Sequence, residues 1–180
     1  VAIDASMWAA LDLAAGAAWA PGFLPFALRG FFENGGRRCH VVTFAPGGLE
    51  AALASLDALD DFDVVCAPDS AGASADHVAI LDLCGRRPGC FALLDTRGTR
   101  LPDPAFTASE LAAGAIAIRG LRGLDACVNA ALYGPWIKVR GACPTCGGSG
   151  CPSCTGTGQG FVPPSGHVAG VLSRLDQKIG

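Results

Sequence analysis

The feature that most constrains this chain is a run of four cysteines in two Cys-x-x-Cys pairs. Cys143 and Cys146 form the first pair, and Cys151 and Cys154 form the second. Two residues between the cysteines of a pair let both thiolates turn toward one ion, and two pairs complete a tetrahedral shell of four sulfurs. Glycines around the pairs supply the backbone freedom that tight turns need. The sequence therefore predicts that residues 141–160 form a metal-binding loop inserted in a larger domain.

Thiolates are soft ligands, so the expected ion is one structural zinc, with an iron–sulfur centre as the second candidate. All four ligand positions are filled by protein, which leaves no open position for catalysis. Two disulfides in a secreted protein are the alternative, but nothing else in the sequence indicates secretion. The pattern Cys-x-x-Cys-x-Gly-x-Gly at 151–158 resembles the zinc modules of the DnaJ chaperone family. This resemblance is confined to the loop, so it supports a metal site and not a chaperone activity.

The remaining cysteines lie in apolar runs without paired spacing: Cys39, Cys66, Cys84, Cys90 and Cys127. We expect them to be buried as small hydrophobic side chains in a reducing compartment. A reactive catalytic thiol is the alternative, although the sequence shows no surroundings that would lower a thiol pKa.

Composition limits the classes of function. The 180 residues fit one domain, 1–180, with a substantial core. Only 16% of the residues are charged, against about a quarter in ordinary soluble domains, so neighbouring subunits are expected to cover part of the surface. The net charge of −3 does not indicate the basic surface that nucleic-acid binding needs. The sequence has no uninterrupted apolar run of about 18 residues, so we expect no membrane span. The first residues lack the layout of a signal peptide. The absence of an initiator Met is expected of a fragment or a processed form.

Hydrophobic periodicity predicts alternating strands and helices. The predicted strands are 38–44, 62–67, 90–95 and 126–139, with Pro135 placing the last one at an edge or a bulge. The predicted helices are 4–15 (capped by Asp4 or Ser6), 24–34, 49–59, 75–87, 109–121 and a last one that Ser165 begins. Strands separated by such helices imply right-handed crossovers. We therefore expect an α/β fold, a three-layer domain with a mostly parallel sheet of about four strands flanked by helices, plus a small zinc-knuckle insertion.

Five blocks stand out in order along the chain: LPFALRGFFENGGRRCHVV (24–42), VVCAPD (64–69), DHVAILDLCGRRPGCFALLDT (76–96), NAALYGPWIKV (129–139) and VPPSGHVAGVLSRLD (162–176). In order and spacing they resemble the contractile tail sheath protein family, the sheath subunits of myophage tails and of related contractile injection systems. In that family a helix ends in Phe-Phe-x-Asn-Gly-Gly before a strand. A later strand usually reads Ala-Ala-Leu-Tyr-x-Pro-Trp, and Pro-Pro-Ser-Gly-x-Val-Ala-Gly follows it.

The resemblance implies a structural subunit and not an enzyme. Such a subunit forms a homo-oligomer in a helical sheath around an inner tube protein, beside other sheath or baseplate subunits. Assembly is expected in the cytoplasm, and the product is a virion tail or an injection-system particle. Two departures matter: the C-terminal domain and the arms that join sheath subunits are missing from this sequence, and the four-cysteine loop is not usual in the family.

Other functions remain as alternatives. The main one is a small zinc-binding adaptor that uses the cysteine loop to bind a partner. A Ser-His-Asp hydrolase has its side-chain types here but lacks the Gly-x-Ser-x-Gly elbow; the candidates are Asp69, Ser70, His77, Asp95, Ser165 and His167. Pro46-Gly47-Gly48 precedes a helix, as a phosphate cradle would, but without the Lys that the pattern requires.

Two aromatic pairs are open to two interpretations. Phe31 and Phe32 either dock a neighbouring subunit or form the apolar face of an amphipathic helix that ends in a glycine cap. Tyr133 and Trp136 belong either to an interface, where such aromatics are enriched, or to the core.

Overall fold

A computed structural model describes residues 1–8, 22–98, 112–117, 120 and 127–179. Its centre is a parallel sheet of three strands, in the order β3-β4-β5. The strands are β3 (Val64–Cys66), β4 (Phe91–Asp95) and β5 (Ala130–Tyr133). They are short and rich in apolar residues, as expected of strands that are covered on both faces. The predicted α/β fold with a parallel sheet flanked by helices is confirmed.

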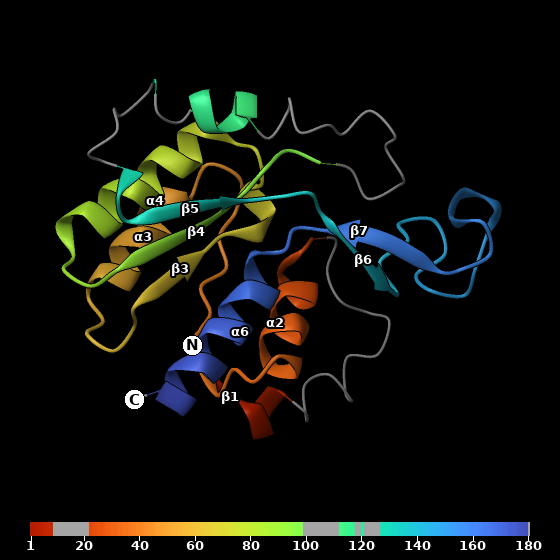
Figure 1. Ribbon diagram of the computed structural model, residues 1–180, viewed down its shortest axis with the longest axis horizontal. Helices are drawn as coiled ribbons and strands as arrows, with labels where there is room; N and C mark the ends of the chain where they lie inside the picture. The colour runs from red at the N-terminus through yellow and green to blue at the C-terminus, as the bar shows by residue number, and fades with distance from the viewer. Residues whose placement is uncertain (9–21, 99–111, 118–119, 121–126, 180) are drawn as a thin grey trace.

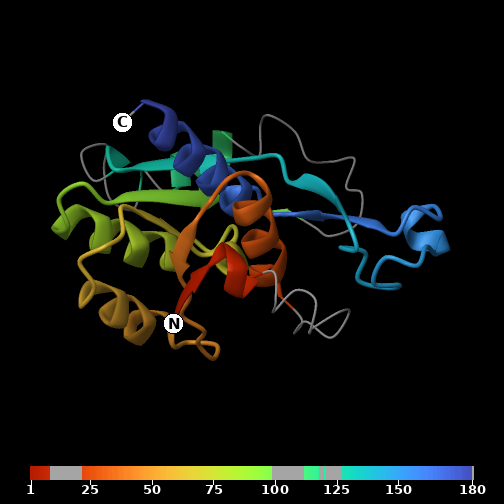
Figure 2. The same ribbon diagram turned by 90° about the horizontal axis from the view of Figure 1, so that it is seen from below.

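Helices α3 (Leu49–Asp57) and α4 (Ser74–Arg86) cover one face of the sheet (Figure 2). Leucines on one side of each helix meet the inward side chains of the strands. The resulting main core contains these buried residues: Leu49, Leu53, Val65, Ile80, Leu81, Leu83, Cys84, Cys90, Ala92 and Leu94. Burial of this apolar area provides most of the driving force for folding.

Helices α6 (Ser165–Ile179) and α2 (Leu24–Glu33) form the layer on the opposite face (Figures 1 and 2). Helix α6 contacts β3 and β4, and α2 packs against α6. Their backbones come close because glycines face the contact. A Cβ atom built on Gly166 would lie 2.5 Å from the Cα atom of Ala27. The molecule therefore has the three layers that the sequence predicts. None of the described helices is both long and apolar enough to cross a membrane.

The first predicted strand does not join the parallel sheet. Residues of the predicted strand 38–44 form β2 (Arg38–His40), which pairs antiparallel with β1 (Ala2–Asp4) in a separate sheet of two strands. In the described residues the central sheet has three of the predicted strands, and the segment 38–44 lies outside it. Strand propensity is local, whereas the partner of a strand is chosen by tertiary packing. Here Ile3, Trp8 and Leu28 form a second small core beside these strands.

The predicted first helix, 4–15, begins as expected but follows a strand that the sequence did not indicate. The Asp4 carboxylate accepts hydrogen bonds from the backbone N–H of Ser6 and of Met7, both at 2.9 Å, and so caps the helical turn. Residues 9–21 lie outside the described part of the chain. Of the predicted helix 109–121, residues 112–117 and 120 are helical, and the others are likewise not described.

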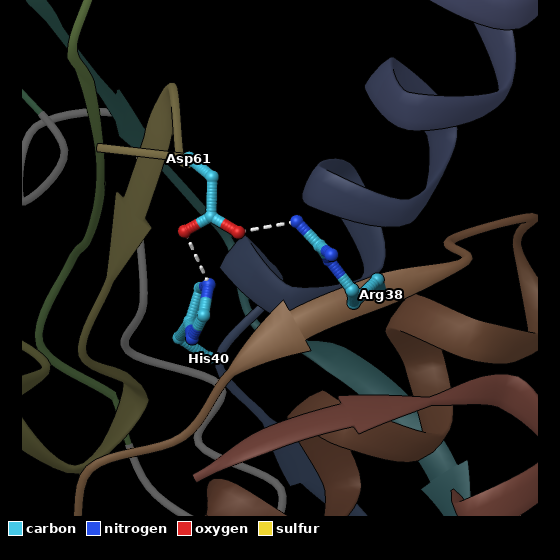
Figure 3. Close-up of polar contacts among 3 residues, drawn as sticks. All are labelled: Arg38, His40 and Asp61. Carbon is cyan, nitrogen blue, oxygen red and sulfur yellow. Dashed lines mark hydrogen bonds and ion pairs between the residues drawn. The ribbon is translucent and has the colours of Figure 1, made fainter. Parts of the chain in front are cut away.

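An ionic cluster joins the small sheet to the loop that leads into β3. Arg38 and His40 both lie on β2, and both point to the carboxylate of Asp61 (Figure 3). The distance from His40 Nε2 to Asp61 Oδ1 is 2.7 Å. Half-exposed ion pairs of this kind contribute about 1 kcal/mol or less to the free energy of unfolding. The main effect of this cluster is therefore to hold β2 beside the loop of Asp61.

The predicted strand 126–139 is two strands that belong to different sheets. Strand β5 ends at Tyr133, and β6 (Ile137–Arg140) starts after Pro135 and pairs antiparallel with β7 (Gln159–Val162). Strand β5 lies at an edge of the central sheet, as Pro135 predicts. Proline has no N–H to continue a ladder, so the chain leaves the sheet there and begins a second ribbon.

Candidate metal centre

The β6–β7 ribbon carries the cysteine loop away from the three-layered body. Figures 1 and 2 both show the ribbon leaving the body and the loop at its far end. The strands pair from Ile137 with Val162 to Arg140 with Gln159. A further hydrogen bond from Gly141 N–H to the Gly158 carbonyl, 3.0 Å, closes the loop. The two ends of the loop are thus held side by side.

The four sulfurs converge. Their Sγ atoms all lie within 4.8 Å of one another. The Sγ–Sγ distance is 3.8 Å from Cys143 to Cys151, 3.8 Å from Cys146 to Cys154 and 3.7 Å from Cys151 to Cys154. A tetrahedron with metal–sulfur bonds of about 2.3 Å has edges of about 3.8 Å. The four cysteines that the sequence predicts as ligands can therefore bind one metal ion.

The alternative of two disulfides does not fit these distances. A disulfide joins its sulfurs at about 2.05 Å. The sulfurs of the cysteine loop 141–160, called the knuckle below, are 3.7–3.8 Å apart in the three pairs given above. A multi-iron cluster places several atoms between its cysteines and would hold the sulfurs further apart. The spacing thus favours a single ion.

The loop is a tandem repeat of eight residues, which the analysis of the sequence missed. Residues 143–150 and 151–158 both read Cys-Pro-x-Cys-x-Gly-x-Gly. The corresponding positions Gly147 and Thr155 have nearly the same positive φ, 55° and 52°. Thr155 is the only described non-glycine residue with positive φ, and the matching position of the first repeat is a glycine. The repetition of the whole octapeptide was the sequence signal that would have predicted a two-fold arrangement.

The two repeats pack against each other reciprocally. A Cβ atom on Gly158 would lie 2.1 Å from the carbonyl oxygen of Gly148, and one on Gly150 would lie 2.6 Å from that of Gly156. The last glycine of each repeat therefore faces the backbone of the other repeat. No side chain fits there, which explains why the loop needs glycine at these positions.

Backbone N–H groups point at the sulfur of the second cysteine in each pair. Gly150 N–H donates to Cys146 Sγ at 3.2 Å, and Gly158 N–H donates to Cys154 Sγ at 3.2 Å. Cys151 N–H also donates to Cys154 Sγ, at 3.3 Å. Such bonds stabilise the thiolate, which is the form that binds a metal.

The thiol pKa values follow this pattern. Burial raises the pKa of Cys154, but hydrogen bonds from the N–H groups of Cys151 and Gly158 outweigh it and bring the pKa to about 6. A backbone hydrogen bond from Gly148 is the largest of the effects that lower the pKa of Cys146. Burial raises the pKa of Cys143. The surroundings therefore favour the thiolate form at the second cysteine of each pair, because the pKa of both thiols is lowered.

Two of the carboxylates considered for a hydrolase hold helix ends. Asp69 accepts hydrogen bonds from the first N–H groups of α2, at 2.6 Å from Phe23 and 3.2 Å from Leu24. Asp95 Oδ1 accepts one from Ser165 N–H at 2.9 Å, at the start of α6. Carboxylates at helix N-termini satisfy unpaired N–H groups and complement the helix dipole. Sequence reasoning missed both contacts because Asp69 and Asp95 lie 46 and 70 residues from their partners.

The two candidate histidines lie in different surroundings from each other. His77 is buried on α4 and lines a cavity of about 290 Å³ together with Asp95, Thr96 and Arg97. The ring of His167 packs on Gly30 of α2. Burial lowers the pKa of both histidines. Ser70, the remaining candidate, is the last residue of η1 (Pro68–Ser70) and is buried.

The aromatic pairs pack within the chain. Trp136 donates its Nε1–H to the Thr96 carbonyl at 2.8 Å and meets Phe23 edge-to-face, with ring centroids 4.9 Å apart. Phe32 stacks on Trp8 at 5.7 Å, and Phe31 lies edge-on to Phe32. For Phe32 and Trp136 the intrachain interpretation holds in this structure.

Comparison with known proteins adds no family to these observations. No protein-family model matches the sequence, and no curated protein matches it significantly. The four-cysteine cluster on the β6–β7 ribbon is the best-defined candidate site in the described part of the chain.

Proposed function

We propose that the chain is a structural sheath-like subunit whose four-cysteine loop binds one zinc ion. The zinc part rests on the Sγ–Sγ distances of 3.7–3.8 Å, which match a tetrahedral ion with bonds of about 2.3 Å. Zinc has no geometric preference of its own and suits four thiolates. A site with four protein ligands has no position for substrate, so the ion acts by joining the two repeats.

The sheath part rests on the resemblance of five sequence blocks to contractile tail sheath subunits. One observation supports it: the blocks, which are far apart in the sequence, meet around the N-terminus of α6. Asp69 of the second block caps α2 in the first, and Asp95 of the third block caps α6 in the fifth. Trp136 of the fourth block bonds to Thr96 of the third. The residues that carry the resemblance therefore contact one another in one part of the fold.

The proposed subunit belongs to the sheath of a contractile phage tail or a phage-tail-like injection system. Its partners are further copies of itself in a helical array, an inner tube protein and other sheath or baseplate subunits. It assembles in the cytoplasm and ends in the virion tail or injection particle. Contraction is a rigid-body change between two packings of the same subunit, and it needs no enzymatic site.

A zinc-binding adaptor is the second candidate function. The observation that favours it is the position of the knuckle at the far end of the β6–β7 ribbon, away from the body (Figure 1). A projecting loop of this kind is well placed to contact another protein. In a sheath the same loop contacts a neighbouring subunit.

Metal analysis and electron microscopy of the purified chain test both proposals. One zinc per chain is expected, together with rings or tubes that form alone or with the inner tube protein. A metal-free chain with all four thiols freely reactive would refute the zinc site. A zinc-loaded monomer that forms no assembly with an inner tube protein, and binds another partner only until zinc is chelated, would refute the sheath and favour the adaptor.

A further inference from the structure

A second pair of sulfurs lies in the main core, at the opposite end of the parallel sheet from the knuckle. Cys84 is in the last turn of α4, and Cys90 directly precedes β4. Their Sγ atoms are 3.0 Å apart, and both residues are free thiols. This Sγ–Sγ distance is shorter than those given above for the knuckle, whose sulfurs are far enough apart to bind an ion between them. No ion of the size of zinc fits between atoms 3.0 Å apart with bonds of about 2.3 Å in tetrahedral geometry.

The backbone between the two cysteines is held in a fixed turn. Arg87 N–H donates to the Cys84 carbonyl at 3.4 Å, and Cys90 N–H donates to the Arg87 carbonyl at 3.1 Å. Gly89, with φ of 82°, makes the reversal that brings Cys90 under the end of α4. The Arg87 guanidinium lies 4.1 Å from the centre of the Phe62 ring, which anchors the turn from outside. The fold thus keeps the two sulfurs facing each other without any bond between them.

We propose that Cys84 and Cys90 form an intrachain disulfide when the protein meets a disulfide oxidant. The sulfurs need to approach by about 1 Å to reach the bonded distance of about 2.05 Å. The resulting cross-link joins the end of α4 to the start of β4 and closes the turn over residues 85–89. Formation of this disulfide depends neither on zinc nor on assembly, so its test does not depend on the proposed function.

The reaction is a pair of thiol–disulfide exchanges with a small disulfide, such as oxidised glutathione. One cysteine thiolate attacks the small disulfide, forms a mixed disulfide and releases one small thiolate. The other cysteine thiolate attacks the protein sulfur of the mixed disulfide and releases the second small thiolate. The two cysteine sulfurs are oxidised, the small disulfide is reduced to two thiols, and these take up the two protons.

Burial makes this pair slow to react in the folded chain. Cys84 is 0% exposed and Cys90 3% exposed, so a small disulfide reaches them only when the turn opens. Burial and the contact with Cys90 also raise the pKa of Cys84, which lowers its thiolate fraction. The disulfide is therefore expected to form readily during refolding and slowly in the native state.

The test uses the full zinc-loaded chain in two arms. In one arm the native chain is incubated with excess oxidised glutathione, and in the other it is unfolded and refolded in a glutathione redox buffer with zinc. Free thiols are then alkylated, and trypsin cuts between Arg86 and Arg87, so the two cysteines end in different peptides. The disulfide holds these peptides together until reductant is added. Because Cys39 and Cys66 share the peptide of Cys84, the assignment uses Cys84→Ser and Cys66→Ser variants.

The expected result is a linked peptide pair that survives in Cys66→Ser and Cys127→Ser and is lost in Cys84→Ser. The melting temperature of the linked protein is expected to rise by about 5 °C, as a short closed loop would give. Cys127 is the informative control because it also packs against the main core. Free Cys84 and Cys90 in both arms, or a link from Cys90 to Cys127 in place of Cys84, would overturn the proposal.

Discussion

At the scale of single residues, the second cysteine of each pair differs from the first. Cys146 and Cys154 each accept a hydrogen bond from the N–H group four residues later, and Cys154 is buried and accepts a second one. At Cys143 burial raises the pKa, and it outweighs the hydrogen bonds that the sulfur accepts from the backbone N–H groups of Thr145 and Cys146. The two thiols with lowered pKa values, Cys146 and Cys154, are therefore expected to contribute most to metal affinity.

Replacing Cys154 by Ser tests this expectation. The Cys154→Ser variant loses one thiolate and leaves two N–H groups directed at a weaker ligand, so zinc affinity is expected to fall by at least about 100-fold. Competition with a chromogenic chelator measures the affinity. Ser153→Ala is the matched control, since Ser153 is an exposed neighbour in η3 (Pro152–Cys154) and should bind zinc as the unmodified chain does. Equal affinities of the two variants would exclude Cys154 as a ligand.

Asp95 is a second residue with a measurable signature. Burial raises its pKa from 3.8 to about 6, against the opposing hydrogen bond from Ser165. The folded state therefore binds this proton more tightly than the unfolded state does. The stability that Asp95 contributes is full below pH 3.8 and is lost as the pH rises through about 6.

The Asp95→Asn variant should lack this pH dependence while it keeps an oxygen for Ser165 N–H. Between pH 4 and pH 7, the unmodified chain should lose up to about 3 kcal/mol of unfolding free energy relative to the variant. Urea unfolding at several pH values measures the difference. The buried His77 and the half-buried His167, with lowered pKa values, have the opposite slope, but they are present in both proteins and cancel. Parallel curves for the two proteins would contradict the assignment.

At the scale of elements, the contact between α2 and α6 decides how the layer opposite α3 and α4 is built. Gly166 faces Ala27, Gly170 faces Phe31, and Gly30 faces the ring of His167. Asp69 and Asp95 hold the N-terminal ends of the same two helices. Glycine weakens an isolated helix by up to about 1 kcal/mol, but here it permits an approach that no side chain would allow.

The Gly166→Ala variant should therefore be destabilised despite the better helix propensity of alanine. Its Cβ atom would lie 2.5 Å from both the Cα and the carbonyl oxygen of Ala27, so the helices must separate. We expect a loss of about 1–3 kcal/mol in unfolding free energy, the typical range for overpacked cores. Gly85→Ala on α4 is the matched control: nothing lies within 4 Å of its Cβ, so it should stabilise by up to about 1 kcal/mol. Thermal unfolding of both variants measures this, and a neutral Gly166→Ala would contradict the close packing.

At the scale of the whole molecule, the chain consists of a body with its own cores and a ribbon that ends in the knuckle. The two hydrophobic clusters lie among the helices and strands of the body. The knuckle has no comparable core and depends on its sulfurs and turns. Small units of this kind usually fold only with their metal, because metal binding supplies the folding free energy.

Removal of zinc should thus unfold the knuckle and leave the body intact. After chelation, backbone amides of residues 143–158 are expected to lose protection from hydrogen exchange, while β3, β4 and α4 keep theirs. Hydrogen exchange with mass spectrometry separates these regions, and added zinc should restore the protection. Loss of protection in β4 at the same rate as in the knuckle would show that the ion supports the entire fold.

The sequence alone determined several features of this protein. The spacing of Cys143, Cys146, Cys151 and Cys154 predicted the cluster, because ligands so close in sequence can meet through local turns only. The alternation of strands and helices predicted the parallel sheet and its helical layers, because hydrophobic period is a local property. Pro135 predicted the edge of the sheet, because proline cannot continue a ladder.

Other features were decided by tertiary structure. Three contacts have no local signal in the sequence. They are the pairing of β2 with β1, the capping of α2 by Asp69 and the contact between Cys84 and Cys90. The split of 126–139 into β5 and β6 depended on the partner that each half found. Local propensity fixes what a segment tends to form, whereas its neighbours are selected by the burial and hydrogen bonding of the whole folded chain.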